Sequence, residues 1–547
     1  MAAVLIGIGV SPGIAAGPVA RMAPPVEVPA ESAPAGPPEA EEAAALTALD
    51  AVAADLERRA NMAPTDAAEV LRAQAMMALD PALAERIATS VRAGHAAVTA
   101  VAAAFDAYRV LLAAAGPYLA ARVADLDDLR NRAVATLLGV PVPGVPSPGH
   151  PFVLVARDLA PADTATLDPA SVLAIVTEQG GPTSHTAILA KSLAIPAVVA
   201  CDSAAQLRDG LPVLVDGSAG TVAVAPTAET IRAALAGQDA HRAALAAVRG
   251  PGRTADGVPV QLLVNIAGDR DLSAAEVDAE GVGLFRTEFL FLDRSDPPTA
   301  DEQQAAYERV FEAFAGRKVV VRTLDAGADK PLRFVTTPDE PNPALGVRGI
   351  RTARRHPRLL STQLTAVAAA ARASRAKAWV MAPMVSTPAE AAEFAATAHQ
   401  HGLPMAGVMV EVPAAALRAP AVLAGCDFLS LGTNDLAQYT YAADRMSGDL
   451  ADLLDPWQPA LLELVRRSAV AGREAGKPVG VCGEAASDPL LAVVLVGLGV
   501  TSLSMAPVSV PAVRAALAAR TFPECQRLAH LALTAPTPAA ARDRLSR

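Results

Sequence analysis

The stretch Gly407-Val-Met-Val-Glu-Val412 decides the fold of the larger part of this chain of 547 residues. It is a short apolar run, and a run of this kind is consistent with a buried β-strand. A carboxylate, Glu411, stands at its end, and a helical, alanine-containing segment follows. The stretch therefore predicts one strand–helix unit with a polar group at the carboxyl end of the strand.

Similar segments alternate with helical ones from Val258 onward. The predicted strands are Val260–Ile266, Val282–Phe285, Val319–Leu324, Trp379–Met384, Gly407–Val412, Phe428–Leu431, Val479–Cys482 and Ser502–Met505. Eight such units over roughly 300 residues predict a (β/α)8 barrel, in which the active site lies at the carboxyl ends of the strands.

Polar side chains gather at or just after the ends of most of these strands. They are Arg286, Glu288, Arg322, Asp325, Glu411, Asn434, Asp435, Cys482 and Glu484. A single residue of this kind is usually a surface or cap residue, and a lone cysteine is usually a small core residue. Repeated after several strands of a fold that brings the strand ends together, the pattern predicts a site.

The residue types at this site suit a phosphorylated acid. Arginine side chains match both phosphate and carboxylate groups, and the candidates for binding them are Arg286, Arg322, Arg348, Lys330 and Arg445. Glu411 and Asp435 offer hard oxygen atoms, and Mg²⁺ normally takes one or two carboxylates together with substrate oxygens.

The first half of the chain predicts a second α/β domain with a helical insert. A strand over Val4–Val10 and an apolar segment up to Ala20 begin it, and Glu39 to Leu138 has the spacing of a helical bundle. Strands then return at Phe152–Val155, Val172–Val176, Ala197–Ala200, Pro212–Asp216 and Thr221–Val224. We therefore expect an α/β domain of residues 1–22 plus 140–228, a helical domain of 23–139, a linker helix of 229–252 and a barrel of 253–547.

The stretch Gly180-Gly-Pro-Thr-Ser-His-Thr186 lies between a predicted strand and a helix that begins near Ala187. Two glycines allow a sharp turn, so His185 stands where unpaired N–H groups and the helix dipole favour an anion. A neutral imidazole at such a place can accept a phosphoryl group. The motif alone leaves open a structural histidine at a helix cap.

Composition limits the kinds of partner and the cellular compartment that the protein can have. The net charge of −11 argues against non-specific nucleic-acid binding and suits a basic protein partner. The four cysteines, Cys201, Cys426, Cys482 and Cys525, are widely spaced and form no secreted-type framework. The N-terminus is a poor signal peptide, and no charge-free apolar run reaches the roughly 18 residues that span a bilayer. We expect a soluble, cytoplasmic protein without membrane insertion.

Eight stretches, in order along nearly the whole chain, carry a family resemblance. They are SPGIAAG (Ser11 to Gly17), GGPTSHTAILAKSLAIPAVV (Gly180 to Val199), GVGLFRTEFLF (Gly281 to Phe291), RTLDAGADKP (Arg322 to Pro331), NPALGVRGIR (Asn342 to Arg351), GVMVEVPAA (Gly407 to Ala415), LSLGTNDLAQYTYAADR (Leu429 to Arg445) and GVCGEAASDP (Gly480 to Pro489). Together they resemble the Enzyme I family of the bacterial phosphotransferase system, the phosphoenolpyruvate-protein phosphotransferases. The histidine and TND stretches are also shared with the wider dikinase and synthase superfamily.

The resemblance implies a role for each matching residue. His185 takes the phosphoryl group of phosphoenolpyruvate, Cys482 protonates the departing enolate to give pyruvate, and Glu411 and Asp435 bind Mg²⁺. The residues implied to hold the substrate are Arg286, Arg322, Lys330, Arg348, Asn434 and Arg445. The implied supporting residues are Thr164, a hydroxyl that hydrogen-bonds the histidine, and Asp325.

The resemblance also implies a multidomain α/β fold and its partners. A swivelling phosphohistidine α/β domain carries an inserted helical bundle and is followed by the C-terminal (β/α)8 barrel. The helical insert docks the carrier protein HPr, and the barrel binds phosphoenolpyruvate and forms a homodimer. Because His185 and the arginine cluster lie in different domains, the histidine domain must swing, with part of the hinge in Glu229 to Gly252.

Two positions and one segment depart from the family. Pro182 stands where the family often has Arg, and Ala328 replaces the second glycine of a pair. The helical insert has Gln74 and few acidic residues around Met76, where the family commonly has more.

Other functions remain open at this point. A pyruvate phosphate dikinase or phosphoenolpyruvate synthase needs an ATP-binding domain of several hundred residues, for which the helical insert is too short. A paralogue that feeds a regulatory carrier often has an extra N-terminal sensory domain. A scaffold without turnover would not need His185, Arg348, Glu411, Asp435 and Cys482 together.

Overall fold

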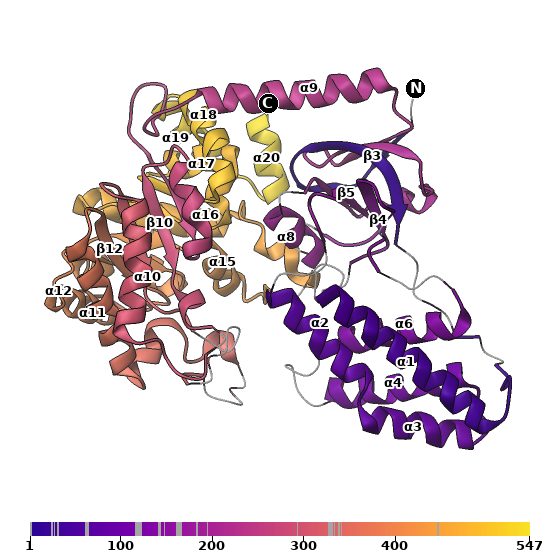
Figure 1. Cartoon of the computed structure of the whole chain (residues 1–547). Coiled ribbons are helices and arrows are strands. Elements are labelled where there is room, and N and C mark those ends of the chain that lie inside the picture. The colour runs from indigo at the N-terminus through magenta and orange to yellow at the C-terminus, as the bar shows by residue number, and fades with distance from the viewer. Residues whose placement is uncertain are drawn as a thin grey trace. The chain divides into compact units, whose positions relative to one another are not determined.

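The computed structural model of the chain describes residues 3–546 except 23–25, 27, 30–31, 61–64, 115–122, 141–143, 147, 160–166, 182–183, 194, 293, 327–331, 333, 337–339, 341 and 446–447. It consists of two compact units, Met1–Ala240 and His241–Arg547 (Figure 1). The multidomain α/β fold that the sequence predicts is confirmed.

The second unit is a closed barrel of parallel strands. In chain order the strands are β9 (Gln261–Ile266), β10 (Gly281–Arg286), β11 (Lys318–Arg322), β12 (Lys377–Ala382), β13 (Ala406–Val410), β14 (Leu429–Leu431), β15 (Val479–Val481) and β16 (Ser502–Met505). Strand β16 pairs with β9, which closes the ring. Strand β12 begins and ends two residues earlier than predicted; it cannot extend to Met384, whose positive φ of 62° a strand cannot accommodate.

Helices alternate with these strands along the chain and surround them (Figure 1). They are α10 (Ala300–Ala313), α11 (Pro357–Ala373), α12 (Pro388–Gln400), α13 (Pro413–Leu417), α14 (Ala419–Ala424), α15 (Thr433–Tyr441), α16 (Pro459–Ala475), α17 (Pro489–Gly497), α18 (Val510–Ala518), α19 (Phe522–Leu533) and α20 (Pro538–Ser546). Thr299 and Glu302 form a capping box at the start of α10: the side chain of each accepts a hydrogen bond from the backbone N–H of the other.

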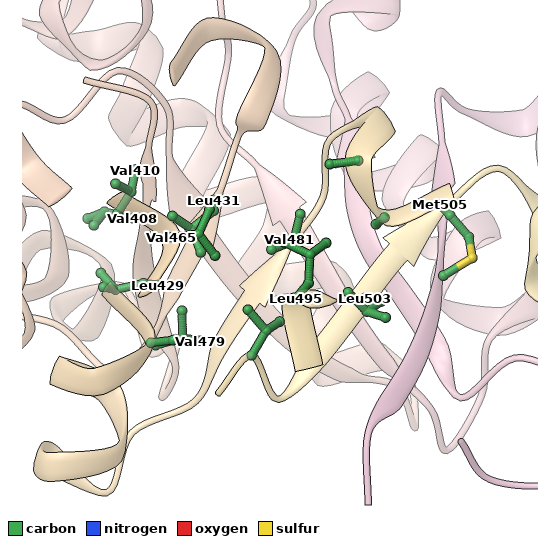
Figure 2. Packing of buried hydrophobic residues seen from close by; sticks show 14 of the residues in the cluster. Val408, Val410, Leu429, Leu431, Val465, Val479, Val481, Leu495, Leu503 and Met505 are labelled. Carbon is green, nitrogen blue, oxygen red and sulfur yellow. The ribbon is translucent and has the colours of Figure 1, made fainter. Parts of the chain in front are cut away.

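The barrel buries two apolar layers because successive side chains of a strand point to opposite faces. Val408 and Val410 of β13 and Leu495 of α17 belong to the outer layer, part of which Figure 2 shows. Met409, between the two valines, belongs to the inner cluster instead. The inner cluster contains Leu284, Val320, Met381, Met409, Phe428 and Cys482. A predicted site residue, Cys482, thus lies inside the barrel.

The first unit contains an eight-stranded sheet in the order β1-β8-β7-β3-β4-β5-β6-β2. Its strands are β1 (Val4–Ile6), β2 (Ile8–Ser11), β3 (Ile14–Arg21), β4 (Phe152–Ala156), β5 (Val172–Thr177), β6 (Ala197–Val199), β7 (Pro212–Asp216) and β8 (Thr221–Val224). The run from β3 to β6 is parallel, and the remaining pairs are antiparallel.

The prediction of one strand over Val4–Val10 is wrong. The chain breaks at Gly7, and β1 and β2 occupy the two opposite edges of the sheet. Because one residue joins the two edge strands, the sheet must be rolled so that its edges approach each other. Gly7 permits this approach, since a Cβ at this position would lie 2.7 Å from the carbonyl oxygen of Val199.

Helices complete the first unit. The helical segment consists of α1 (Pro38–Ala60), α2 (Thr65–Ala78), α3 (Pro81–Arg92), α4 (Ala97–Ala114) and α6 (Val123–Leu138). Its core contains Leu56, Ile87, Phe105 and Leu129. Helix α8 (His185–Ser192) follows β5, and α9 (Ala228–Ala247) runs across the boundary between the two units. Within the described residues, no helix has both the length and the apolar character required to cross a membrane.

Leu495 provides a test of the packing between the barrel strands and their helices. It is fully buried in the outer layer, so Leu495→Ala is expected to lower the free energy of unfolding of this unit by about 2–5 kcal/mol. Both tryptophans, Trp379 and Trp457, lie in the barrel unit, so tryptophan fluorescence during urea unfolding reports on this unit. The matched control is Leu417→Ala, because Leu417 is 54% exposed. Equal losses in both variants would contradict the packing described here.

Candidate active site

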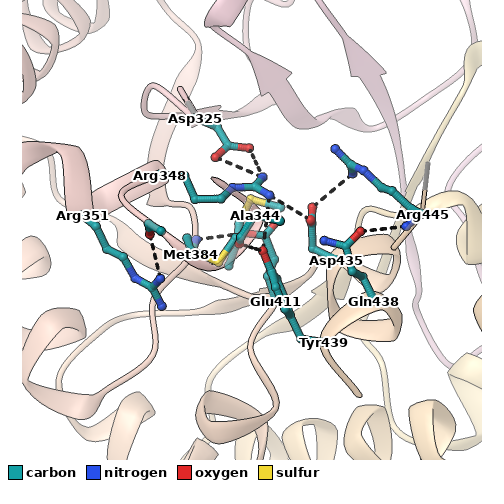
Figure 3. A network of polar contacts seen from close by, with 12 residues as sticks. Asp325, Ala344, Arg348, Arg351, Met384, Glu411, Asp435, Gln438, Tyr439 and Arg445 are labelled. Carbon is teal, nitrogen blue, oxygen red and sulfur yellow. Dashed lines mark hydrogen bonds and ion pairs between the residues drawn. The ribbon is translucent and has the colours of Figure 1, made fainter. Parts of the chain in front are cut away.

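A chain of alternating charges lies at the carboxyl ends of the barrel strands (Figure 3). Its members, in order of contact, are Glu288, Arg322, Asp325, Arg348, Asp435 and Arg445. Neighbouring members have opposite charge, which is the arrangement that allows several ionised groups to be buried together.

Arg348 is the central member of this charge chain. Its Nη2 lies 3.2 Å from Oδ2 of Asp325, and its Nη1 lies 3.2 Å from Oδ1 of Asp435. Its backbone lies just before the short helical turn Gly349–Arg354, whose first residue has a positive φ of 57°. A Cβ at Gly349 would lie 2.7 Å from Cβ of Met384. The glycine therefore lets the segment that carries Arg348 approach the end of β12.

Arg322 is the last residue of β11 and is also buried. It donates to Glu288, and its Nη1 lies 3.2 Å from Oδ2 of Asp325. Burial by itself would lower the pKa of Arg322, but Glu288, Asp325 and Glu411 outweigh burial and raise the pKa. The guanidinium is thus held in its charged form within a dry site.

Glu411 follows β13 and is 1% exposed. Its Oε2 accepts a hydrogen bond of 2.8 Å from the backbone N–H of Met384. Burial, with the negative charges of Asp435 and Asp325, raises the pKa of Glu411 to about 8, against the opposing effect of Arg322. The positive φ of Met384 is a strained conformation for this residue type, and it accompanies the N–H contact with the carboxylate.

The carboxylates suit a magnesium ion. Glu411 and Asp435 come from neighbouring strand–helix units, and Gly432 leaves the space beside Glu411 open, since a Cβ there would lie 2.8 Å from Oε1. The part of the chain that the structure describes contains no cluster of three or more His, Cys, Asp or Glu residues suited to a metal. Two carboxylates are nevertheless the donor set with which Mg²⁺ binds phosphorylated substrates, whose oxygens and water complete the shell. The residues present fit this ion.

Cys482 follows β15 and is 3% exposed. Its Sγ accepts a hydrogen bond of 3.2 Å from Oγ of Ser430, and its S–H donates to the carbonyl oxygen of Leu431 at 3.6 Å. Burial raises the pKa of the Cys482 thiol to about 11; Ser430, Arg322 and Arg286 lower the pKa, and Glu411 raises it. The thiol is therefore protonated at neutral pH and can act as an acid.

The structure brings most of the predicted barrel residues into one region. Arg322, Asp325, Arg348, Asp435 and Arg445 are linked by ion pairs. Glu411 and Cys482 are within electrostatic reach of Arg322. Arg286 is the exposed last residue of β10, and its positive charge lowers the pKa of Cys482. Asn434 is exposed on α15.

Other predicted residues cannot be placed in this way. Lys330, Thr164, Pro182 and Ala328 lie outside the described residues. His185 is the first residue of α8, in the unit Met1–Ala240, and its side chain also lies outside the described part. Helix α8 begins two residues before the predicted start near Ala187, and Ser184 caps it by accepting the N–H of Ala187 at 3.3 Å.

Several residues of the site were not predicted. Ser430 contacts the thiol, Met384 donates to Glu411, and the hydroxyl of Tyr439 accepts from Arg348 at 3.5 Å. Gln363 supports the end of β11, where its Oε1 accepts the N–H of Leu324 at 2.9 Å. Of these residues, only Ser430 could have been predicted from the sequence. It lies between Leu429 and Leu431 in a strand, and because successive side chains point to opposite faces, it faces the barrel interior when the two leucines face the helices.

Comparison with known proteins shows which family the chain belongs to. Three family models match, described as the PEP-binding domain of PEP-utilising enzymes over residues 242–522, their mobile domain over 148–220 and their N-terminal domain over 6–122. The chain is 57% identical to the phosphoenolpyruvate-protein phosphotransferase of Streptomyces coelicolor over 547 residues, covering 99% of this chain and 98% of the relative. It is 41% identical to that of Haloferax volcanii, covering 91% and 90%, and 39% identical to that of Bacillus subtilis, covering 72% of each. The chain therefore belongs to the phosphoenolpyruvate-protein phosphotransferase family.

Proposed function

We propose that the protein transfers the phosphoryl group of phosphoenolpyruvate to its own His185 and then to a histidine of the carrier protein HPr, as the first step of the sugar phosphotransferase system. Pyruvate is the other product. The observation that carries this proposal is the site at the carboxyl ends of the barrel strands, where buried arginines and carboxylates lie beside a buried, protonated thiol.

The proposed reaction breaks two bonds and forms two. The P–O bond of phosphoenolpyruvate breaks, and a P–N bond forms to a ring nitrogen of His185. The electrons left on the enol oxygen form the carbonyl group, the S–H bond of Cys482 breaks, and its proton forms a C–H bond with the methylene carbon. The residues proposed to hold the phosphate and carboxylate of the substrate are Arg286, Arg322, Lys330, Arg348, Asn434 and Arg445. Catalysis of this kind depends on positioning and on neutralising charge.

Glu411 and Asp435 are proposed to hold Mg²⁺, which, when bound, neutralises charge on the transferring phosphoryl group. Arg348 contacts Asp435 directly, so the guanidinium orients one of the two proposed ligands. Asp325, on the other side of Arg348, fixes the position of that guanidinium. The ion-pair chain thus couples the groups that bind substrate with those that bind the ion.

The parts of the chain receive separate roles in this proposal. Residues 1–22 plus 140–228 carry His185, which Thr164 supports, and residues 229–252 form the linker about which this domain swivels. Residues 253–547 bind phosphoenolpyruvate and form a homodimer. Residues 23–139 dock HPr, and the exposed Met76 and Leu79 at the end of α2 support this choice of surface. The reaction takes place in the cytoplasm.

His185 is the residue that tests the proposal most directly. Wild-type protein with Mg²⁺ and phosphoenolpyruvate labelled at phosphorus is expected to yield an acid-labile, base-stable phosphoprotein together with pyruvate. His185→Ala is expected to lose the label, whereas His150→Ala, which changes an exposed histidine of the same unit, is expected to keep it. Absence of label on wild type, or undiminished label on His185→Ala, would refute the proposal.

Cys482 is expected to supply the proton of pyruvate. Cys482→Ala should lower the rate of pyruvate formation by roughly 10²–10⁴-fold, the usual contribution of a positioned acid. A single-turnover measurement of pyruvate would show this, with Cys525→Ala, a buried cysteine of α19, as the control. Because the acid must be protonated and its pKa is raised to about 11, thiol titration should not reduce the wild-type rate between pH 7 and about pH 9. A rate that Cys482→Ala leaves unchanged would remove Cys482 from the mechanism.

Magnesium binding is expected to depend on pH through Glu411. A carboxylate must lose its proton to ligate, and the pKa of Glu411 is raised to about 8, so binding releases a proton below that pH. The apparent affinity for Mg²⁺ should rise with pH by up to about tenfold per unit and level off above about pH 8. Calorimetry in buffers of different ionisation enthalpy measures the released proton, and Glu411→Gln should abolish the release. An affinity that is independent of pH would contradict this assignment.

A further inference from the structure

The interior of the barrel contains a small polar chamber in its amino-terminal half. Its polar lining comes from Lys318, Ser430, Ser502 and Ser504, and Trp379 and other apolar side chains complete the wall. The volume of the chamber that the centre of a water molecule can occupy is about 20 Å³. On this measure, about 10–15 Å³ is enough to hold one ordered water. Three hydroxyl groups and an amine provide the two to four polar partners that such a water needs.

One side of the chamber leads to the active site. Ser430 lines the chamber, and its Oγ also donates to Sγ of Cys482 at 3.2 Å. The thiol itself belongs to the apolar inner cluster of the barrel and is 3% exposed. Ser430 is therefore the group that joins the thiol to the chamber.

The other side of the chamber ends at Lys318, the first residue of β11. Its Nζ lies 3.8 Å from the centroid of the Trp379 ring and 3.4 Å from Oε1 of Gln261, and the residue is 8% exposed. Burial lowers the pKa of Lys318 to about 8, while the negative charge of Glu280 opposes this effect. An amine with this pKa carries a proton at neutral pH and also releases it readily.

The proposed reaction creates a need for such a group. Each turnover takes the proton from Cys482 and leaves a thiolate in a site that burial makes unfavourable for the charge. Of the two hydrogen-bond partners of the sulfur among the described residues, the Leu431 carbonyl has no proton, and the Ser430 hydroxyl can give one only if it takes another in return. The proton must therefore come to the thiolate through a neighbour.

We propose that Lys318 restores the proton of Cys482 through the chamber, with Ser430 as the last donor. The Ser430 hydroxyl gives its proton to the thiolate and takes one from chamber water, which takes one from the Lys318 ammonium. The net change converts thiolate and ammonium into thiol and amine, and the amine then regains a proton from solvent at the amino-terminal rim. This inference rests on the proposed function. Neither residue touches substrate, so both act through Cys482.

The direction of transfer agrees with the two acids. The thiol, with a pKa raised to about 11, is a weaker acid than the ammonium of Lys318, with a pKa lowered to about 8. Transfer from the ammonium to the thiolate is therefore favourable. The reverse reaction uses the same path, because the amine can then accept the proton that the thiolate takes from pyruvate.

The test follows hydrogen and carbon in the reverse direction. Phosphorylated protein is mixed with pyruvate that carries deuterium on the methyl group and a carbon label, and two rates are measured: loss of deuterium to water, and carbon exchange into phosphoenolpyruvate. In wild type, deuterium loss is expected to exceed carbon exchange, since the deuteron leaves the sulfur through the chamber. In Lys318→Met and Ser430→Ala, the ratio of the two rates should fall at least about fivefold, because the deuteron returns from the sulfur to carbon.

The control and a rescue separate this role from a structural one. Lys377 pairs in register with Lys318 at the start of β12, is exposed and does not line the chamber, so Lys377→Met should keep the wild-type ratio. In Lys318→Ala, added methylamine should restore the ratio, because it replaces the amine but not the packing. An unchanged ratio in Lys318→Met, or an equal fall in Lys377→Met, would overturn the inference. Absence of carbon exchange in wild type would instead refute the proposed function.

Discussion

The contact of Arg348 with Asp325 and Asp435 is the interaction on which the site depends. Both carboxylates are buried, and a buried charge without a partner costs several kcal/mol. Arg348 compensates both at 3.2 Å, and Arg322 and Arg445 extend the alternation at either end. Three segments that follow β10, β11 and β14 thereby acquire one fixed arrangement, although they are far apart in the chain.

The same charges determine which groups hold protons. Glu411 has two carboxylates near it and one arginine, and its pKa is raised, whereas Arg322 is surrounded by carboxylates and remains charged. Cys482 lies just inside the barrel, where burial keeps its thiol protonated. An acid, a pair of oxygen ligands and fixed positive charge thus lie together in a region from which water is largely excluded, where electrostatic stabilisation is strongest.

The amino-terminal half of the barrel gives a further role to residues that would otherwise be assigned to stability. Layers of side chains usually fill such a barrel. Here Lys318, Ser502 and Ser504 face a chamber that reaches Ser430, and Ser430 contacts the thiol. The inference that protons pass this way extends the site from the carboxyl ends of the strands to the opposite rim.

The sequence by itself determined the barrel and the residue types of its site. Short apolar runs that alternate with helical segments leave one arrangement of eight parallel strands, and a residue directly after a strand, such as Glu411 or Cys482, must then lie at the carboxyl end. The single strand predicted over Val4–Val10 was wrong, because the break at Gly7 follows from the rolling of the sheet and leaves no apolar pattern. Only the tertiary structure decided that Asp325 and Asp435 share Arg348, that the backbone of Met384 contacts Glu411, and that Ser430 joins Cys482 to a chamber ending at Lys318. These contacts join residues distant in the chain, and the geometry and burial that create them arise only when the strands close into a ring.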